Sequence, residues 1–310
     1  MDVVLDILDD FVFTPYLYPT SWQTSYWLRQ FISLVIIVYV GATVLYFGTA
    51  SLCYALLFDK RLMEHPRFLK NQIRREIKWS IMSMPLMNIP TAWMFYLHHR
   101  GYGKTYHGVS SNTWLGYFSL PVEFVLVVLF TDMMIYWIHR AFHHRLLYSA
   151  IHKPHHAFKV PSPFASHAFH PIDGFMQSFP YHLFPFIFPL NKYLYVMFFV
   201  MVNFWTVSIH DGECKVPDVL KPVINGSAHH TDHHLFYNYN YGQFFTFWDR
   251  IAGSYRNPSI FTNAGPLDAV IEKKLSTNQN KTAEDVDSVS PPDWTTTVKR
   301  KGESLRLAAS

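Results

Sequence analysis

Charged side chains are scarce in this chain of 310 residues: Asp, Glu, Lys and Arg make up 15% of it, whereas ordinary globular proteins contain about 25%. Half of the residues are hydrophobic and 18% are aromatic, which excludes an intrinsically disordered protein and argues against an ordinary soluble enzyme. The net charge is +4, from 26 basic and 22 acidic residues. This near balance does not indicate nucleic-acid binding.

Cysteine is scarce as well, with Cys53 and Cys214 the two in the sequence. Cys53 lies inside an apolar run, so a disulfide framework is not expected, and two thiols cannot make a thiolate metal cluster. The first ten residues, MDVVLDILDD, carry four aspartates. A secretory signal would need positive charge there, so we do not expect one.

Long runs without charge predict membrane-spanning helices. Residues 30–58 contain no charged side chain, and a helix of that length exceeds the ~30 Å hydrocarbon core of a bilayer. A second run, 79–97, is weaker because Pro85 and Pro90 would kink it. A third run, 114–138, is interrupted by two acidic residues, which inside a span usually face a polar interior.

The run from 174 to 209 contains a single charge, Lys192. As one span it is too long, and Pro185 and Pro189 lie near its middle. We therefore expect a hairpin of two shorter helices that turns near residues 189–192. This arrangement alone returns the chain to the side on which the histidine clusters described below can meet.

The distribution of basic residues predicts the direction of the spans. Seven Lys and Arg lie in residues 59–78, whereas the first 28 residues contain none. The positive-inside rule places the 59–78 loop in the cytosol and the N-terminus on the lumenal side. His139, at the end of the third span, then emerges on the cytosolic side.

These features divide the chain into four parts. They are a lumenal N-terminal segment (1–28), transmembrane helices with a basic cytosolic loop (29–113), a domain that contains most of the histidines (114–257) and a largely disordered cytosolic tail (258–310).

Histidine is abundant: the sequence has 18, and 14 of them lie between His139 and His234. Ten of these form three clusters with regular spacing: His139, His143 and His144; His152, His155 and His156; and His229, His230, His233 and His234. Three such clusters in one chain are not explained by chance. They predict a metal site.

The spacing within the clusters suits two metal ions. Residues four apart on a helix lie on one face, with about 5–6 Å between their Cβ atoms, and the clusters contain four such pairs. Ten imidazoles are too many for one ion and fit a dinuclear centre with an open position. Neutral imidazole suits Fe, Zn, Cu or Ni. No Glu-x-x-His pair of the ferritin-like kind is present.

Three aspartates near the clusters are expected to orient the histidine rings. Asp132 precedes His139 by seven residues, Asp232 lies inside the third cluster, and Asp211 follows His210. His210 comes directly after the predicted hairpin and would face the site, so it is a further candidate ligand.

At these residues the sequence resembles the membrane-bound fatty acid hydroxylase and sterol desaturase superfamily, whose histidine boxes read HX3HH, HX2HH and HHXXHH. The likeness is sharpest to the delta-7-sterol 5(6)-desaturases. It includes FTPYLYPTSW at 13–22, HPRFLKNQIRREIKW at 65–79, HKPHHAFKVPSPFASHAFHPIDGF at 152–175, SIHDG at 208–212 and the run 224–258. It covers residues 1 to about 270.

The resemblance implies an all-α, polytopic protein of the endoplasmic reticulum membrane, with a helical cytosolic cap that carries a dinuclear centre. The centre would hold two non-haem irons, for which zinc can substitute, and the ten clustered histidines would be ligands and catalytic residues. His170 is expected to contact a metal-binding histidine without binding the metal itself. In relatives a second histidine follows the position of His210 by four residues; here that position is Cys214, which weakens a ligand role for His210.

The function implied is an O2-dependent oxidoreductase that uses two electrons from cytochrome b5 to place the 5(6) double bond into a delta-7 sterol. This is the step from lathosterol to 7-dehydrocholesterol in cholesterol biosynthesis. The chain has no Gly-rich dinucleotide fingerprint, so electrons must come from a partner. Aromatic residues expected to line the sterol pocket are Phe164, Phe169, Phe175, Trp205, Phe236 and Tyr237.

Three alternatives remain open at this point. The boxes do not distinguish desaturation from hydroxylation, so a sterol or lipid hydroxylase or a 4-methylsterol oxidase is possible. A haem electron carrier would place paired histidines inside the spans rather than just beyond them. A metal transporter would hold its ligands near the bilayer midplane.

Overall fold

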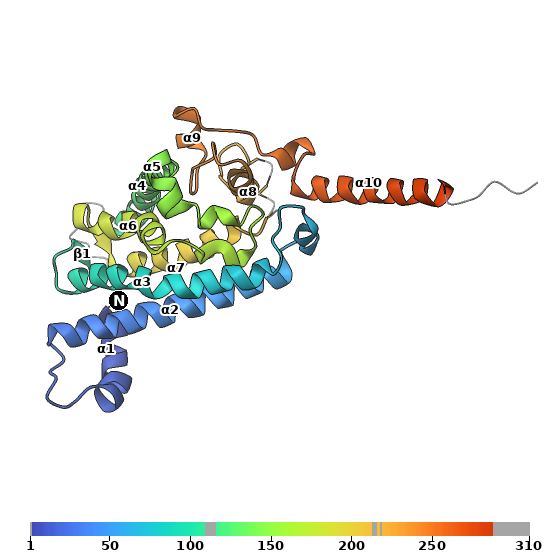
Figure 1. Ribbon diagram of the computed structural model, residues 1–310. Helices are drawn as coiled ribbons and strands as arrows, with labels where there is room; N and C mark the ends of the chain where they lie inside the picture. Colours follow the sequence, from blue (N-terminus) through green and yellow to red (C-terminus); the bar gives the residue numbers. More distant parts are fainter. Residues whose placement is uncertain (1, 109–115, 213–215, 218, 288–310) are drawn as a thin grey trace, which may run out of the picture.

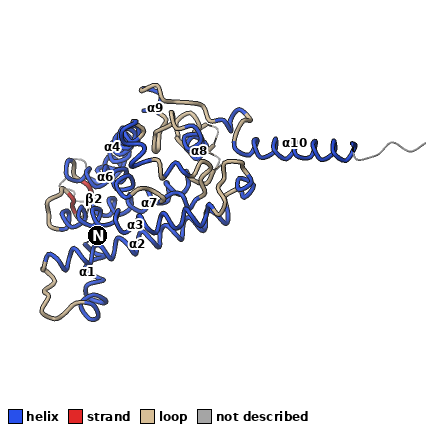
Figure 2. The backbone as a smooth tube through the Cα atoms, viewed as in Figure 1, coloured by secondary structure: helices blue, strands red, loops and turns tan. Residues whose placement is uncertain are grey.

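The computed structural model describes residues 2–108, 116–212, 216–217 and 219–287. Within them the chain is mostly helical, with one two-stranded parallel sheet (Figures 1 and 2). The long helices are α2 (Trp27–Leu56), α3 (Gln72–His99), α4 (Ser119–Phe142), α6 (Pro171–Ile187), α7 (Lys192–Ile209), α8 (Ser227–Phe236) and α10 (Pro266–Asp287). This confirms the expected helical class.

The short elements connect these helices. They are α1 (Asp2–Leu8), η1 (Asp9–Leu17), η2 (Lys60–Glu64), β1 (Thr105–Tyr106), η3 (Gly116–Phe118), α5 (Arg145–Leu147), η4 (Tyr148–His152), η5 (His155–Ala157), η6 (Pro163–His167), β2 (Leu190–Asn191), α9 (Phe247–Ile251) and η7 (Ser259–Thr262).

Three helical segments in the described part of the chain are long and apolar enough to cross a membrane. They are Trp27–Leu56, Gly116–Phe142 and Lys192–Ile209. The first two correspond to the expected spans 30–58 and 114–138. The weaker run 79–97 lies within α3, which continues through both of its prolines and packs alongside α2 (Figure 1). The run is less apolar than the three candidates because it contains Ser80, Ser83, Asn88 and Thr91 as well as the two prolines.

The run 174–209 is broken into two helices, as its prolines predict. α6 ends at Ile187 and α7 begins at Lys192. The Oδ1 atom of Asn191 accepts a hydrogen bond of 2.9 Å from the backbone N–H of Tyr193, which satisfies one of the free donors in the first turn of α7. The turn also pairs with residues 105–106 as strand β2.

Hydroxyl groups of α2 and α3 fix the segment that follows the second histidine cluster. Tyr46 Oη donates to the carbonyl of Phe164 at 2.9 Å, and Ser83 Oγ donates to the carbonyl of Phe169 at 2.5 Å. The side chains of Tyr46, Met84 and Phe164 are buried together in the core between these helices. Helices α2 and α3 therefore support the segment between the second histidine cluster and α6.

The last described part of the chain differs from the disordered tail expected after residue 257. It contains η7 and then α10, a helix of 22 residues that projects away from the rest of the molecule (Figure 1). Lys274 on α10 forms an ion pair of 2.6 Å with Glu64, which joins the start of this helix to the loop between α2 and α3. Residues 288–310 lie outside the described part.

Candidate metal centre

Nine buried or half-buried histidines form two adjoining groups in which the ring nitrogens face one another. In each group the nitrogen atoms lie within 4.8 Å of one another. The first group contains His139, His143, His152, His156 and His233, and the second contains His155, His210, His230 and His234. The second and third sequence clusters contribute to both groups, whereas the first contributes only to the five-histidine group.

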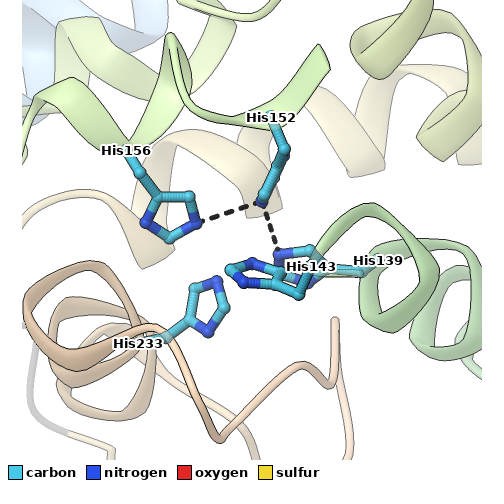
Figure 3. A group of neighbouring side chains, drawn as sticks. All are labelled: His139, His143, His152, His156 and His233. Carbon is cyan, nitrogen blue, oxygen red and sulfur yellow. Dashed lines mark hydrogen bonds between the residues drawn. The ribbon is translucent and has the colours of Figure 1, made fainter. Parts of the chain in front are cut away.

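The five-histidine group is built by three separate parts of the chain (Figure 3). His139 and His143 lie one turn apart at the C-terminal end of α4, His152 and His156 come from the η4–η5 segment, and His233 comes from α8. The Nε2 atom of His152 lies 3.1 Å from Nε2 of His139 and 3.0 Å from Nε2 of His156.

The four-histidine group lies beside the first, because the ring centroid of His234 is 4.6 Å from that of His156 in the five-histidine group. Its Nε2 atoms form a chain: His210 to His230 is 3.0 Å, and His230 to His234 is 3.2 Å. His155 completes the group, with its Nε2 atom 3.4 Å from that of His210. His230 and His234 are one of the two helical pairs expected in the third cluster.

The opposite ring nitrogens are held by acceptors. Nδ1 of His139 donates to the carbonyl of Tyr241 at 2.8 Å, and Nδ1 of His233 donates to that of Tyr239 at 2.8 Å. In the second group, Nδ1 of His210 donates to the carbonyl of its own helix at residue 206 (2.6 Å), and Nδ1 of His234 to that of residue 158 (3.0 Å). Since a carbonyl only accepts, the proton of each neutral ring must be on Nδ1.

Nδ1 of His152 likewise donates to a carboxylate, so the Nε2 atoms of His139 and His152 both present lone pairs. Two lone pairs 3.1 Å apart repel each other unless a cation lies between them. Metal–nitrogen bonds of about 2.0–2.1 Å place neighbouring ligand nitrogens at about this separation. The buried Nε2 atoms of His143 and His233 have no hydrogen-bond partner among the described residues. The residues present thus fit two imidazole-bound metal ions.

Burial keeps these rings neutral, as metal ligands must be. Desolvation lowers the pKa of His233 to about 3 and that of His210 to about 4. The pKa values of His155, His156, His230 and His234 are lowered in the same direction by burial and then by neighbouring rings. Neutral imidazole is the form that binds a metal without first losing a proton.

A cavity opens beside the four-histidine group. It has a volume of about 130 Å³ and lies between α3, α4, α6 and α7, and His155, His210 and His230 form part of its wall. Its lining is mostly apolar, as in sites that take hydrophobic ligands. Of the six aromatic residues expected to line the pocket, Phe169 does so; the other five are not part of this lining.

Two of the ten clustered histidines lie outside both groups. His144 is exposed and its Nδ1 atom accepts from the backbone N–H of Leu146, because α4 ends at Phe142 and the next turn points its side chain outward. His229 is buried, but its ring packs near Tyr255 and Phe261, with centroids 5.9 Å away in each case. His210, the additional candidate, lies within the second group.

The acidic residues expected to orient the rings have other partners. Asp132 accepts from the backbone N–H of Phe244 and Phe245 at 2.8 and 3.0 Å, and Asp232 accepts from Ser259. Asp211 lies 3.9 Å from the thiol of Cys53.

His170 was expected to contact a metal-binding histidine without binding the metal itself. It is instead the N-cap of α6, and its Nδ1 atom accepts from the backbone N–H of Ile172. Cys214, the position that weakened the ligand role of His210, lies outside the described residues.

The carboxylate that does contact a clustered histidine is Asp173, which the sequence analysis missed. Nδ1 of His152 donates to its Oδ2 atom at 2.7 Å, and both side chains are fully buried. Asp173 lies in the first turn of α6, 21 residues after its partner. The run HPIDGF, with an acid two residues after the proline that starts a helix, is the available signal, since acids are favoured in the first turn of a helix.

Comparisons with known proteins agree with this geometry. The fatty acid hydroxylase family matches residues 124–254. Human lathosterol oxidase is 56% identical over 272 residues, which is 88% of this chain and 91% of the human protein, and the mouse lathosterol oxidase is 55% identical over 86% and 89%. The chain belongs to the lathosterol oxidase family. It is therefore an oxidoreductase.

The family extends to fungi. A delta(7)-sterol 5(6)-desaturase of Aspergillus fumigatus is 48% identical over 269 residues, covering 86% of this chain and 75% of the fungal protein. No solved structure matches. Membership of the lathosterol oxidase family, the three candidate spans and the two histidine groups together favour a membrane enzyme over the haem carrier and the metal transporter considered above.

Proposed function

We propose that the chain introduces the 5(6) double bond into a delta-7 sterol, converting lathosterol into 7-dehydrocholesterol in cholesterol biosynthesis. The observation that carries this proposal is the identity to lathosterol oxidases over nearly the whole chain. The apolar cavity beside the four-histidine group supports it, because a sterol is almost entirely hydrocarbon. The catalytic domain is residues 114–257, around the matched region 124–254.

The proposed centre contains two irons, one in each histidine group. Bound iron would supply, with O2, the oxidising power for removing two hydrogens from unactivated carbons, which no side-chain acid or base can do. The protein holds the ligand nitrogens in place through the Nδ1 contacts and the Asp173–His152 pair. The apolar wall of the cavity excludes water and orients the flat sterol against His155, His210 and His230.

The remaining parts of the proposal concern partners and place. We expect the electrons to come from cytochrome b5, because the chain has no nucleotide-binding fingerprint. The basic segment 59–78 supports a cytosolic orientation of the site, and we expect the membrane to be that of the endoplasmic reticulum. Arg67, in that loop, donates to the carbonyl of Leu235 at 3.4 Å, which puts the loop beside α8.

The function is tested in membranes that contain the chain and no other sterol desaturase. We expect lathosterol, O2 and reduced cytochrome b5 to yield a sterol with a conjugated ring diene, detected by its ultraviolet absorption and by mass spectrometry. A membrane with His234→Ala should give none. A hydroxylated or C4-oxidised product from the wild-type chain would show that it is instead a hydroxylase or a methylsterol oxidase of the same superfamily.

A further inference from the structure

Several polar side chains that line the cavity beside the metal centre are already bonded within the protein. Thr91 and Ser178 donate their hydroxyls to the carbonyls of Met87 and Phe175 in their own helices. Asn203 is bonded through both ends of its amide. These groups are already satisfied and offer little to a substrate.

Gln177 and Asn88 differ from them. Gln177 lines the cavity and donates its Nε2–H to Oδ1 of Asp173 at 2.7 Å, so its carbonyl oxygen is the atom that it can offer to a ligand. Asn88 also lines the cavity and is 6% exposed, and its Nδ2 atom has no hydrogen-bond partner among the described residues. One side chain supplies an acceptor and the other a donor.

The two residues lie at the same level of the cavity. Helices α3 and α6 approach most closely where a Cβ on Gly174 would meet the sulfur of Met87. Asn88 is the next residue after Met87, and Gln177 lies three residues after Gly174, on the same face of α6. A donor and an acceptor that face the same space are the partners that a single hydroxyl group needs.

This level is close to the metal centre. Gln177 contacts Asp173, and Asp173 contacts His152 of the five-histidine group at 2.7 Å. A delta-7 sterol has one polar group, its 3-hydroxyl, and C5 is separated from the oxygen by only two carbon atoms along the ring. A sterol whose C5 and C6 face the metals must therefore place this hydroxyl near the centre, where burial without a partner would be costly.

We propose that Gln177 and Asn88 bind the 3-hydroxyl of the sterol, and that this contact selects 3-hydroxysterols and sets which ring bond faces the metals. The inference rests on the proposed function. Asn88 donates to the hydroxyl oxygen and the hydroxyl donates to Gln177. Both are positioning residues, and Gln177 additionally links the bound hydroxyl to the histidine that Asp173 orients.

The test compares lathosterol with its 3-deoxy analogue. We expect the wild-type chain to prefer lathosterol by about 10- to 100-fold in kcat/KM, the effect of leaving buried polar groups unpaired. Gln177→Leu and Asn88→Leu should each reduce that ratio at least about fivefold, mainly through the rate with lathosterol. Ser178→Ala, which changes a cavity hydroxyl bonded within its helix, should leave the ratio within about twofold.

A binding measurement separates selection from folding and from metal loss. The zinc-loaded chain cannot turn over, so its affinity for the two sterols is read directly, with bound zinc counted in each variant. Among the described residues, no hydrogen bond joins Asn88 to a metal-binding histidine. Asn88→Leu should therefore bind as much zinc as the wild type but lose the preference for lathosterol over its 3-deoxy analogue. If both leucine variants lost affinity equally for lathosterol and for the 3-deoxy analogue, the proposal would be wrong.

Two other outcomes are informative. His182 also lines the cavity, and its buried Nε2 atom has no hydrogen-bond partner in the described part of the chain, but it lies more than a turn beyond Gln177 along α6. If His182→Phe, and neither leucine variant, abolished the preference for lathosterol over its 3-deoxy analogue, the hydroxyl would bind at the His182 end of the cavity and the assignment would be wrong. A wild-type chain that binds both sterols but converts neither would defeat the proposed function instead.

Discussion

At the scale of single residues, the neighbours His143 and His144 offer the sharpest test of which histidines hold metal. Nε2 of His143 is buried among the rings of the five-histidine group, whereas His144 is exposed. We expect His143→Ala to lower metal affinity at least about tenfold and His144→Ala to leave metal content at the wild-type value. Elemental analysis of the purified variants measures this. Equal loss in both would show that His144 is a ligand after all.

The carboxylate of Asp173 should affect the metal through His152. It accepts the Nδ1 proton of that ring, which fixes the ring orientation and makes Nε2 a better donor. Replacing such a partner typically costs about 10- to 100-fold in metal affinity, and we expect this from Asp173→Ala, measured by competition with a chelator.

Asp232→Ala is the matched control for that measurement. Its carboxylate is also buried but accepts from Ser259 rather than from a histidine. If Asp232→Ala weakened metal binding as much as Asp173→Ala, the effect would come from general disruption of the fold and not from the Asp173–His152 contact.

At the scale of elements, helix positions follow from the sequence better than side-chain partners do. The apolar runs located α2, α4 and α7, and Pro185 and Pro189 located the break between α6 and α7. Four-residue spacing also located His139 with His143 and His230 with His234, because both pairs lie within single helices. These are local properties of the chain.

The failures concern contacts between elements. His229 has the same spacing from His233 as His230 has from His234, yet its ring packs near Tyr255 instead, since α8 is surrounded on several sides and only part of its surface meets the centre. Asp173 was missed for the same reason: its pairing with His152 depends on how α6 packs against the η4 segment. Spacing along one helix does not determine such packing.

A buried carboxyl joins α3 to the segment after the second histidine cluster, and it makes this junction sensitive to pH. Glu76 is fully buried and contacts the side chains of Gln72 and Ser162. Burial raises its pKa to about 7 from the ordinary 4.5. In the unfolded chain it ionises above 4.5, so its contribution to stability is fully present below that pH and is lost as the pH rises through 7.

We therefore expect Glu76→Gln to remove this pH dependence. A pKa raised by about 2.5 units corresponds to roughly 3 kcal/mol, so at pH 8 the variant should melt several degrees above the wild type, and at pH 4.5 the two should be close. Thermal unfolding in detergent measures the difference. A wild type that loses no more stability than Glu76→Gln between these pH values would contradict the raised pKa.

At the scale of the whole molecule, the ends of several helices gather where the histidines are. α4 ends and α6 begins beside the five-histidine group, and α7 ends at His210 of the other (Figure 1). A Cβ on Gly212, just after α7, would meet Leu62 in the loop between α2 and α3. The basic loop and the metal centre thus share one end of the helices, so the side of the membrane that holds the loop must also hold the centre.

This geometry makes one labelling experiment decisive for the orientation. In a background with Cys53→Ala and Cys214→Ser, single cysteines replace Arg61 in the basic loop, whose side chain is 63% exposed, and Tyr16 in the N-terminal segment, which is 84% exposed. In sealed microsomes, a membrane-impermeant thiol reagent should label Arg61→Cys at once and Tyr16→Cys only after the membrane is permeabilised. The positive-inside rule gives this order. The reverse order would place the metal centre in the lumen, where cytosolic cytochrome b5 could not reach it, and would require a different electron donor.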